Sequence, residues 1–329
     1  MRKLVLAAAA IVAITLLVAS TAVADRDAIV RFATLPPDQP GHPEGIAADP
    51  AGNIYAASFD FSGNNVIYVF SRAGHLADTI PLGGHVPLGM QWGPDGKLYV
   101  ADFGNGSVLQ LAPPSHAVMR TYAICVAEAH ATPSTCGLNA IAFKGGVLYA
   151  SDSFGGRIFT LDTTSGASAP WITDDELRPG PHGFPGFGAN GLAFDAGGNL
   201  YVANTADDRI LKITPAKVIT HFTESINGAD GIAFDTAGRL WVCANQENVL
   251  YVLDGAGRVV DIRGSFEGIG KDGAPRGLLF PASIVQSRGS MYVTNTALGF
   301  RHFFVDEPPG GPTVFTISRV PLGKDRGGD

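Results

Sequence analysis

The segment ADGIAFDTAGRLWVCAN, residues 229–245, decides the fold because variants of it recur along the chain. Its apolar run 231–234 predicts a short buried strand. Residues 235–238 predict a tight turn, since Asp can hydrogen-bond its own backbone and Gly readily adopts positive φ. The Leu-Trp-Val that follows predicts a second strand, and the segments Val249–Leu253 and Arg258–Ile262 predict two more. One unit therefore consists of four antiparallel strands.

Five further copies of this segment are recognisable by eye. They read PEGIAADPAGNIYAAS from Pro43, PLGMQWGPDGKLYVAD from Pro87, LNAIAFKGGVLYASD from Leu138, ANGLAFDAGGNLYVAN from Ala189 and PASIVQSRGSMYVTN from Pro281. The third residue of each copy marks an equivalent position, and these anchors are Gly45, Gly89, Ala140, Gly191, Gly231 and Ser283. Successive anchors are 40 to 52 residues apart, the period of propeller blades. The sequence thus predicts an all-β, six-bladed β-propeller.

The composition agrees with many short buried strands joined by tight turns. The chain of 329 residues has 42 Gly, 46% hydrophobic residues and only 16% charged residues. These values argue against a disordered chain, a long-helix protein and a small disulfide-rich protein. The formal charge of −7 argues against nucleic-acid binding, which normally requires a basic face. We expect a monomer that acts on a small molecule.

The count of fourth strands predicts how the ring closes. Copies one to five are each followed by a candidate fourth strand, whereas the sixth copy reaches the C-terminus with little chain left after Val314–Ile317. Residues Ile29–Ala33, which precede the first copy, can supply the missing strand. Closure by this N-terminal strand would cover an otherwise open sheet edge. An open stack of repeats is the alternative.

The first 24 residues have the features of a secretory signal peptide. Basic Arg2 and Lys3 precede the apolar run Leu4–Ala19, and Ala22-Val23-Ala24 is a small-residue cleavage pattern. We therefore predict a signal peptide over residues 1–24 and one propeller domain over residues 25–329. The mature protein would be secreted or periplasmic and not bound to a membrane. A retained membrane anchor is the alternative.

The residue before each anchor is expected at the mouth of the central channel, because every inner strand begins there. These residues are Glu44, Leu88, Asn139, Asn190, Asp230 and Ala282. Four of the six carry a side-chain oxygen and none is His or Cys, a ligand set that suits Ca²⁺ before Mg²⁺ and disfavours zinc. In the alternative interpretation, the Asn and Asp side chains only bond turn backbones.

The repeat architecture and the order Glu, Asn, Asn, Asp in blades one, three, four and five resemble the senescence marker protein / gluconolactonase (regucalcin-like) family. The resemblance implies that Glu44, Asn190 and Asp230 bind a divalent metal. It also implies that Asn139 contacts substrate and that Asp230 is the general base. The chain departs from mammalian-type members at two points. Gly137 stands where they have an Arg, and Ser151–Phe154 lacks their substrate-contacting Glu, so a sugar lactone is not the expected substrate.

These residues predict an exported, metal-dependent hydrolase of small cyclic esters. A divalent ion can polarise a lactone carbonyl and favour ionisation of water, and a carboxylate beside it can take the proton. One alternative is a non-catalytic propeller that binds a protein, peptide or glycan on the face of the channel mouth. Another is a strictosidine-synthase-like enzyme, for which we would expect a carboxylate near Ala282 and Ser283.

Several further residues are candidates for roles near the site. Cys125 and Cys136 are predicted to form a disulfide shortly before Asn139, and Cys243 to be a buried free thiol. His182, within the insertion 179–188, is a candidate substrate contact.

Polar residues recur where second strands end, and we expect them mainly to cap turns. Asn204 and Asn245 are also candidates for orienting the metal ligands. This set is Asp102, Asp152, Asn204, Asn245 and Asn295.

Overall fold

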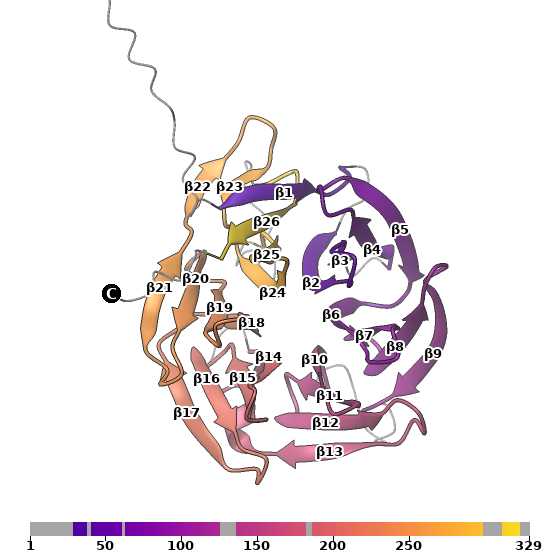
Figure 1. Ribbon diagram of the computed structural model, residues 1–329, viewed down its shortest axis with the longest axis vertical. Coiled ribbons are helices and arrows are strands. Elements are labelled where there is room, and N and C mark those ends of the chain that lie inside the picture. The colour runs from indigo at the N-terminus through magenta and orange to yellow at the C-terminus, as the bar shows by residue number, and fades with distance from the viewer. Residues whose placement is uncertain are drawn as a thin grey trace, which may run out of the picture.

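A computed structural model describes six ranges of the chain, which are residues 29–37, 41–60, 63–125, 136–181, 186–298 and 311–322. Within them, six four-stranded antiparallel sheets are arranged in a ring around a central channel (Figure 1). The predicted all-β six-bladed propeller is confirmed. The predicted signal peptide lies outside the described residues, and the domain boundaries stay a prediction. Across the described ranges, no helix is both long and apolar enough to cross a membrane.

The first three blades follow the chain in order, each from its inner to its outer strand. Blade one consists of β2 (His42–Ala48), β3 (Ile54–Phe59), β4 (Asn65–Phe70) and β5 (Leu76–Gly83). Blade two consists of β6 (Pro87–Trp92), β7 (Leu98–Asp102), β8 (Ser107–Ala112) and β9 (Ala117–Ala123). Blade three consists of β10 (Leu138–Lys144), β11 (Val147–Asp152), β12 (Arg157–Asp162) and β13 (Ser168–Thr173).

The next two blades repeat this order, with two short insertions. Blade four follows the 3₁₀ turn η1 (Asp175–Leu177) and consists of β14 (Ala189–Phe194), β15 (Leu200–Asn204), β16 (Arg209–Ile213) and β17 (Ile219–Glu224). Blade five consists of β18 (Ala229–Phe234), β19 (Leu240–Ala244), β20 (Val249–Leu253) and β21 (Val259–Arg263). A small hairpin of β22 (Phe266–Ile269) and β23 (Pro275–Gly277) precedes blade six.

Blade six is built from both ends of the described chain. Its strands β24 (Pro281–Ser287), β25 (Ser290–Asn295) and β26 (Thr316–Pro321) are completed by β1 (Val30–Thr34), which pairs antiparallel with β26. The predicted closure by the N-terminal strand is confirmed. Because β1 is bonded into the sheet that begins with β24, the chain cannot open the ring without breaking this ladder.

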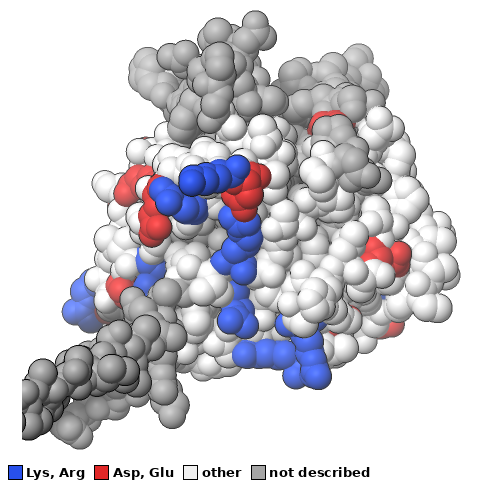
Figure 2. Space-filling model, turned by 90° about the horizontal axis from the view of Figure 1, so that it is seen from above, with Lys and Arg blue, Asp and Glu red and all other residues white. Residues whose placement is uncertain are grey.

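The core is divided among the junctions between blades. Each of the six junctions has its own cluster of buried apolar side chains. Between blades one and two, for example, Ile67 and Tyr55 share a cluster with Leu98 and Leu109. A single blade therefore cannot bury its faces alone, and stability requires the whole ring. Figure 2 shows that much of the surface visible there is uncharged, with Lys and Arg over its central and left parts and Asp and Glu beside some of them.

The anchor glycines allow the inner strands to approach one another around the channel. A Cβ atom on Gly89 of β6 would lie 2.6 Å from the carbonyl oxygen of Asn139 and 2.7 Å from the Cα of Ala140, both in the next inner strand. Gly191 would similarly meet the Asp230 carbonyl oxygen at 2.3 Å, and Gly231 that of Ala282 at 2.4 Å. Glycine is thus required here by close backbone contact between blades rather than by a turn.

We expect Gly89→Ala to lower the free energy of unfolding by about 3 kcal/mol, because the methyl group must push two backbone segments apart. Urea unfolding measures this change. Gly255→Ala is the matched control, since no atom lies within 4 Å of the added methyl group, and the expected change is under ~1 kcal/mol. Equal unfolding midpoints for the two variants would contradict the argument.

Candidate functional site

A β-bulge recurs at the start of all six inner strands. In every blade, the pairing of the inner with the second strand shifts register between the first and fourth residues of the repeat, as between Pro43 and Ile46 or between Ala229 and Ile232. The residue before each anchor lies inside this bulge. A bulge bends the strand and re-aims the side chain, so the same irregularity presents six side chains at one end of the channel.

All six of these positions line one small pocket, with a volume of about 70 Å³. Glu44, Asn139, Asn190 and Asp230 are each between 5% and 8% exposed, while Leu88 and Ala282 supply apolar surface. The structure thus brings together the four polar residues that the repeats singled out.

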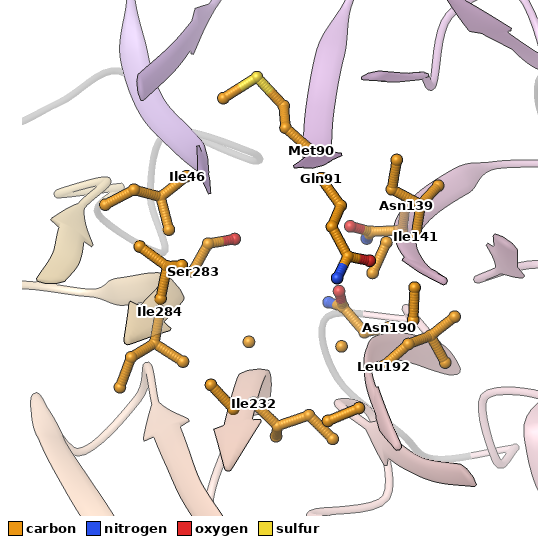
Figure 3. A pocket seen from close by; sticks show the side chains of 18 of the residues that line it. Ile46, Met90, Gln91, Asn139, Ile141, Asn190, Leu192, Ile232, Ser283 and Ile284 are labelled. Atoms are coloured by element: carbon orange, nitrogen blue, oxygen red, sulfur yellow. The ribbon is translucent and has the colours of Figure 1, made fainter. Parts of the chain in front are cut away.

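A second, larger cavity of about 330 Å³ lies along the channel and shares Asn139 and Asn190 with the pocket. Most of the side chains around it are apolar (Figure 3). Its apolar ring consists of Ile46, Met90, Ile141, Leu192, Ile232 and Ile284.

The two carboxylates of the pocket are buried without a compensating charge among the described residues. Burial, and then the negative charge of Asp230, raise the pKa of Glu44 well above its ordinary value. Burial also raises the pKa of Asp230 to about 7, although hydrogen bonds from Asn245 and Asn190 favour its ionised form. Glu44 Oε2 and Asp230 Oδ1 have no hydrogen-bond partner in the described structure. Both oxygens are therefore suited to a cation or a proton.

Two hydroxyl groups set the orientation of the Asn190 and Asn139 amides. The Thr205 hydroxyl donates to the carbonyl oxygen of Ala229 at 2.7 Å, and the Ser153 hydroxyl donates to that of Ala189 at 2.8 Å. A hydroxyl has only one hydrogen, so each of these two hydroxyls must act as the acceptor toward its neighbouring amide. Asn190 Nδ2 therefore donates to the Thr205 hydroxyl at 3.0 Å, and Asn139 Nδ2 donates to the Ser153 hydroxyl at 3.2 Å. The amide oxygens are thereby turned away from the hydroxyls and left as acceptors.

Of the two residues considered for orienting the predicted ligands, only Asn245 contacts one of them. Its Nδ2 donates to Asp230 Oδ2 at 3.1 Å. Asn204 instead donates to the carbonyl oxygens of Glu176 and Arg178, both at 2.9 Å, and fastens the loop before blade four. The remaining second-strand ends also bond loop backbone: Asp102 accepts from Val86 N, Asp152 from Gly137 N and Asn295 from Leu279 N.

The donor set restricts which metal could bind. Among the described residues, no group of three or more His, Cys, Asp or Glu side chains comes together. A cation in the pocket would therefore rely on two carboxylates and neutral amide oxygens. Such oxygen-only sites suit hard cations such as Ca²⁺, and the unpartnered carboxylate oxygens fit this requirement.

An apolar wall lies above these polar groups, and the repeats did not predict it. Phe59, Phe103, Phe187, Phe280 and Leu298 line the pocket together with Val86 and Leu88. Most of them lie in or beside connections between strands, where no periodicity marks a side chain as buried. One signal was available, because Phe103 directly follows the second strand of blade two and Phe154 comes two residues after that of blade three.

Two other predictions concern the loops of this face. Cys125 and Cys136 form a disulfide, with Cα atoms 6.3 Å apart, and Cys243 is a buried free thiol. The disulfide joins the chain just after β9 to the residues before β10. The candidate substrate contact His182 lies outside the described residues. Beside the pocket, His85 Nδ1 is 2.6 Å from Oδ2 of the fully buried Asp102, and the adjacent Val86 lines the wall.

Comparison with known proteins finds related folds but no related sequence. No protein-family model matches the chain, and no curated protein sequence matches it. A gluconolactonase from Xanthomonas campestris has a TM-score of 0.61 at 15% identity, over 90% of this chain and 89% of that one. A luciferin-regenerating enzyme has a TM-score of 0.59 at 14% identity, over 85% and 91% of the two chains. The resemblance to gluconolactonase-type propellers is confirmed for the fold.

The same fold also occurs with a different activity. A catalytically inactive variant of virginiamycin B lyase from Staphylococcus aureus, solved with quinupristin, has a TM-score of 0.58 at 13% identity. The alignment covers 90% of this chain and 99% of the lyase. At such identities the comparisons establish architecture, and the chemistry has to be argued from the pocket.

We expect the cation-free protein to lose on the order of 3 kcal/mol of stability between about pH 4 and pH 7. In the unfolded chain the two carboxyls titrate near ~3.9 and ~4.3, whereas in the fold the pKa values of Asp230 and Glu44 are raised. The folded state therefore holds protons that the unfolded state has released, so stability falls as pH rises through this window. Urea unfolding in chelator, with and without added Ca²⁺, measures the effect.

Asp230→Asn is the control for this pH dependence. Its free energy of unfolding should fall less steeply as the pH rises, because one of the two buried carboxyls is gone. The comparison is necessary because the carboxylates of Glu176 and Glu224 raise the pKa of His221, whose contribution also declines with rising pH. An unchanged slope in Asp230→Asn would show that the buried pair is not the cause.

Thr205→Val is expected to weaken divalent-cation binding by about 10- to 100-fold, because it removes the acceptor that orients Asn190. Thr205→Ser keeps the hydroxyl and should restore most of the affinity, and Thr220→Val on the exposed face of β17 should have no effect. Calorimetric titration with Ca²⁺ measures the three affinities. If Thr205→Val binds as tightly as the unmodified protein, the orientation argument fails.

Proposed function

We propose that the protein is an exported, calcium-dependent hydrolase of small cyclic esters that works at the channel mouth. The observation that carries this proposal is the pair of buried carboxylates with unpartnered oxygens, Glu44 Oε2 and Asp230 Oδ1. Beside them are two amides whose oxygens remain available because Thr205 and Ser153 engage their NH₂ groups. Isolated buried carboxylates are costly, so their retention at one site favours a functional cation.

Glu44, Asn190 and Asp230 would hold the cation, with Asn245 steadying Asp230 through its hydrogen bond to Oδ2. The bound cation would supply positive charge that polarises the ester carbonyl and favours ionisation of water. The amide oxygen of Asn139 is placed to accept a hydrogen bond from substrate or water in the same pocket.

In the proposed reaction, a water oxygen attacks the carbonyl carbon of the lactone. Asp230 accepts the proton released by the water through Oδ1, the oxygen that Asn245 does not engage. The ring C–O bond breaks, and the proton returns to the departing alkoxide oxygen. The product is the open hydroxy acid, and Asp230 is regenerated as a carboxylate.

The remaining features of the proposal concern the protein's setting. We infer a monomer that is secreted or periplasmic, acts on a small molecule and does not bind nucleic acid. The disulfide between Cys125 and Cys136 is compatible with an oxidising compartment. His182 remains a predicted substrate contact. The sixth mouth position is Ala282, so a mechanism that needs a carboxylate there, as expected for a strictosidine-synthase-like enzyme, has no support.

We expect Asp230→Asn and Glu44→Gln to lower kcat/KM for lactone opening by at least about 100-fold, because each removes a buried carboxylate from the reacting centre. The measurement is a panel of lactones at fixed free Ca²⁺, combined with metal analysis of the purified protein. Asp162→Asn, at an exposed turn of blade three, is the control and should retain activity.

Two outcomes would contradict the proposal. If both variants keep full turnover and full metal content, the active-site assignment is wrong. A folded protein that binds no divalent cation and opens no lactone would instead favour a non-catalytic propeller that binds a partner on this face.

A further inference from the structure

The wall of the pocket has a chemical character that the carboxylates do not explain. Phe59, Leu88, Phe280 and Leu298 form a buried apolar cluster separate from the six clusters between blades, and Phe103 packs against it. All five residues line the pocket. This cluster contributes to no junction core and lines the pocket instead.

Two aromatic rings of this wall, Phe103 and Phe187, pack against a third ring, Phe154, from the blade between them. Phe103 lies edge-on to Phe154, with ring centroids 5.7 Å apart, and Phe154 stacks on Phe187 at 5.4 Å. A Cβ atom on Gly137 would lie 2.7 Å from the Phe103 ring and 2.8 Å from the Phe154 ring. The rings therefore occupy the space that a side chain at position 137 would need, and the wall presents hydrocarbon there.

Several polar hydrogens of the pocket are already engaged. The Thr205 and Thr296 hydroxyls donate to backbone carbonyl oxygens of the next blade, and the Asn245 amide donates to Asp230. Among the described residues that line the pocket, none is Lys, Arg, His, Tyr or Trp. A ligand hydroxyl near Glu44 or Asp230 can donate to their unpartnered oxygens. A ligand that carries hydroxyl groups over its whole length would also press some of them against the apolar wall, where they lose hydration without gaining partners.

We propose that the substrate carries an alkyl or aryl substituent, which packs on this wall while its ester carbonyl faces Glu44 and Asp230. The inference rests on the proposed lactone hydrolysis and narrows it to apolar-substituted lactones rather than polyhydroxylated sugar lactones. The volume of about 70 Å³ holds several water-sized groups, since one water needs ~10–15 Å³. The substituent is therefore short. Once it fills the pocket, a further methylene no longer raises kcat/KM.

The activity test uses γ-lactones with hydrogen, methyl, ethyl, propyl and butyl substituents, together with glucono-δ-lactone. We expect kcat/KM to rise about fourfold for each added methylene until the pocket is filled, and glucono-δ-lactone to be the poorest substrate. In Phe103→Ser and Phe187→Ser, the ratio of propyl to unsubstituted rates should fall at least tenfold. Met119→Ser, on the exposed outer strand β9, is the control and should keep the ratio.

A binding test separates this inference from the proposed hydrolysis. Calorimetry with 2-alkylcyclopentanones, which cannot be hydrolysed, should show affinity that rises with chain length and loses this dependence in Phe103→Ser. If no lactone is opened but the ketones bind in this way, the apolar pocket stands and the hydrolase proposal fails. Flat affinities across the ketones, a preference for glucono-δ-lactone, or an unchanged ratio in Phe103→Ser would overturn the apolar-substrate inference.

Discussion

The close approach of backbone to backbone around the channel is the constraint on which the rest of the structure depends. At Gly89, Gly191 and Gly231 an added Cβ would lie 2.3 to 2.7 Å from backbone atoms of the next inner strand. Only strands this close can bring six bulges to the rim of one narrow channel. Because each blade buries its faces only against its two neighbours, the ring has to close before all six junction cores are complete, and β1 completes the last blade.

The tight ring also creates the electrostatic character of the site. Glu44 and Asp230 come from blades one and five, yet the charge of one raises the pKa of the other. Their burial is maintained by an apolar wall that excludes water and strengthens every electrostatic interaction inside the pocket. Hydroxyls and amides directly after second strands, such as Thr205 and Asn245, then decide which oxygens remain open. Carboxylate and amide oxygens form one side of the pocket, and apolar side chains form the other. This arrangement suits an ester that carries an apolar substituent.

Much of this was predictable because the chain repeats itself. The repeated segment predicted the six blades, and the missing strand of the sixth copy predicted closure by β1. The position before each anchor predicted that Glu44, Asn139, Asn190 and Asp230 would lie near one another. The aromatic wall was not predicted, because Phe187 and Phe280 lie in connections without periodicity. Asn245 and Asn204 also differ in register, because Ala189 pairs with Asn204 whereas Ala229 pairs with Ala244. Asn245 therefore occupies the position of Thr205, beside the inner strand, and Asn204 bonds a loop instead.

The sequence by itself determined the architecture and the place of the polar residues, since strand alternation, turn glycines and a fixed period are local properties that each copy repeats. Only the tertiary structure decided what those residues can do. The orientation of an amide depends on a hydroxyl from the neighbouring strand and a carbonyl from the next blade, as for Asn190, Thr205 and Ala229. The apolar wall likewise forms only where connections from several blades meet. Such contacts join residues far apart in the chain, and no local pattern encodes them.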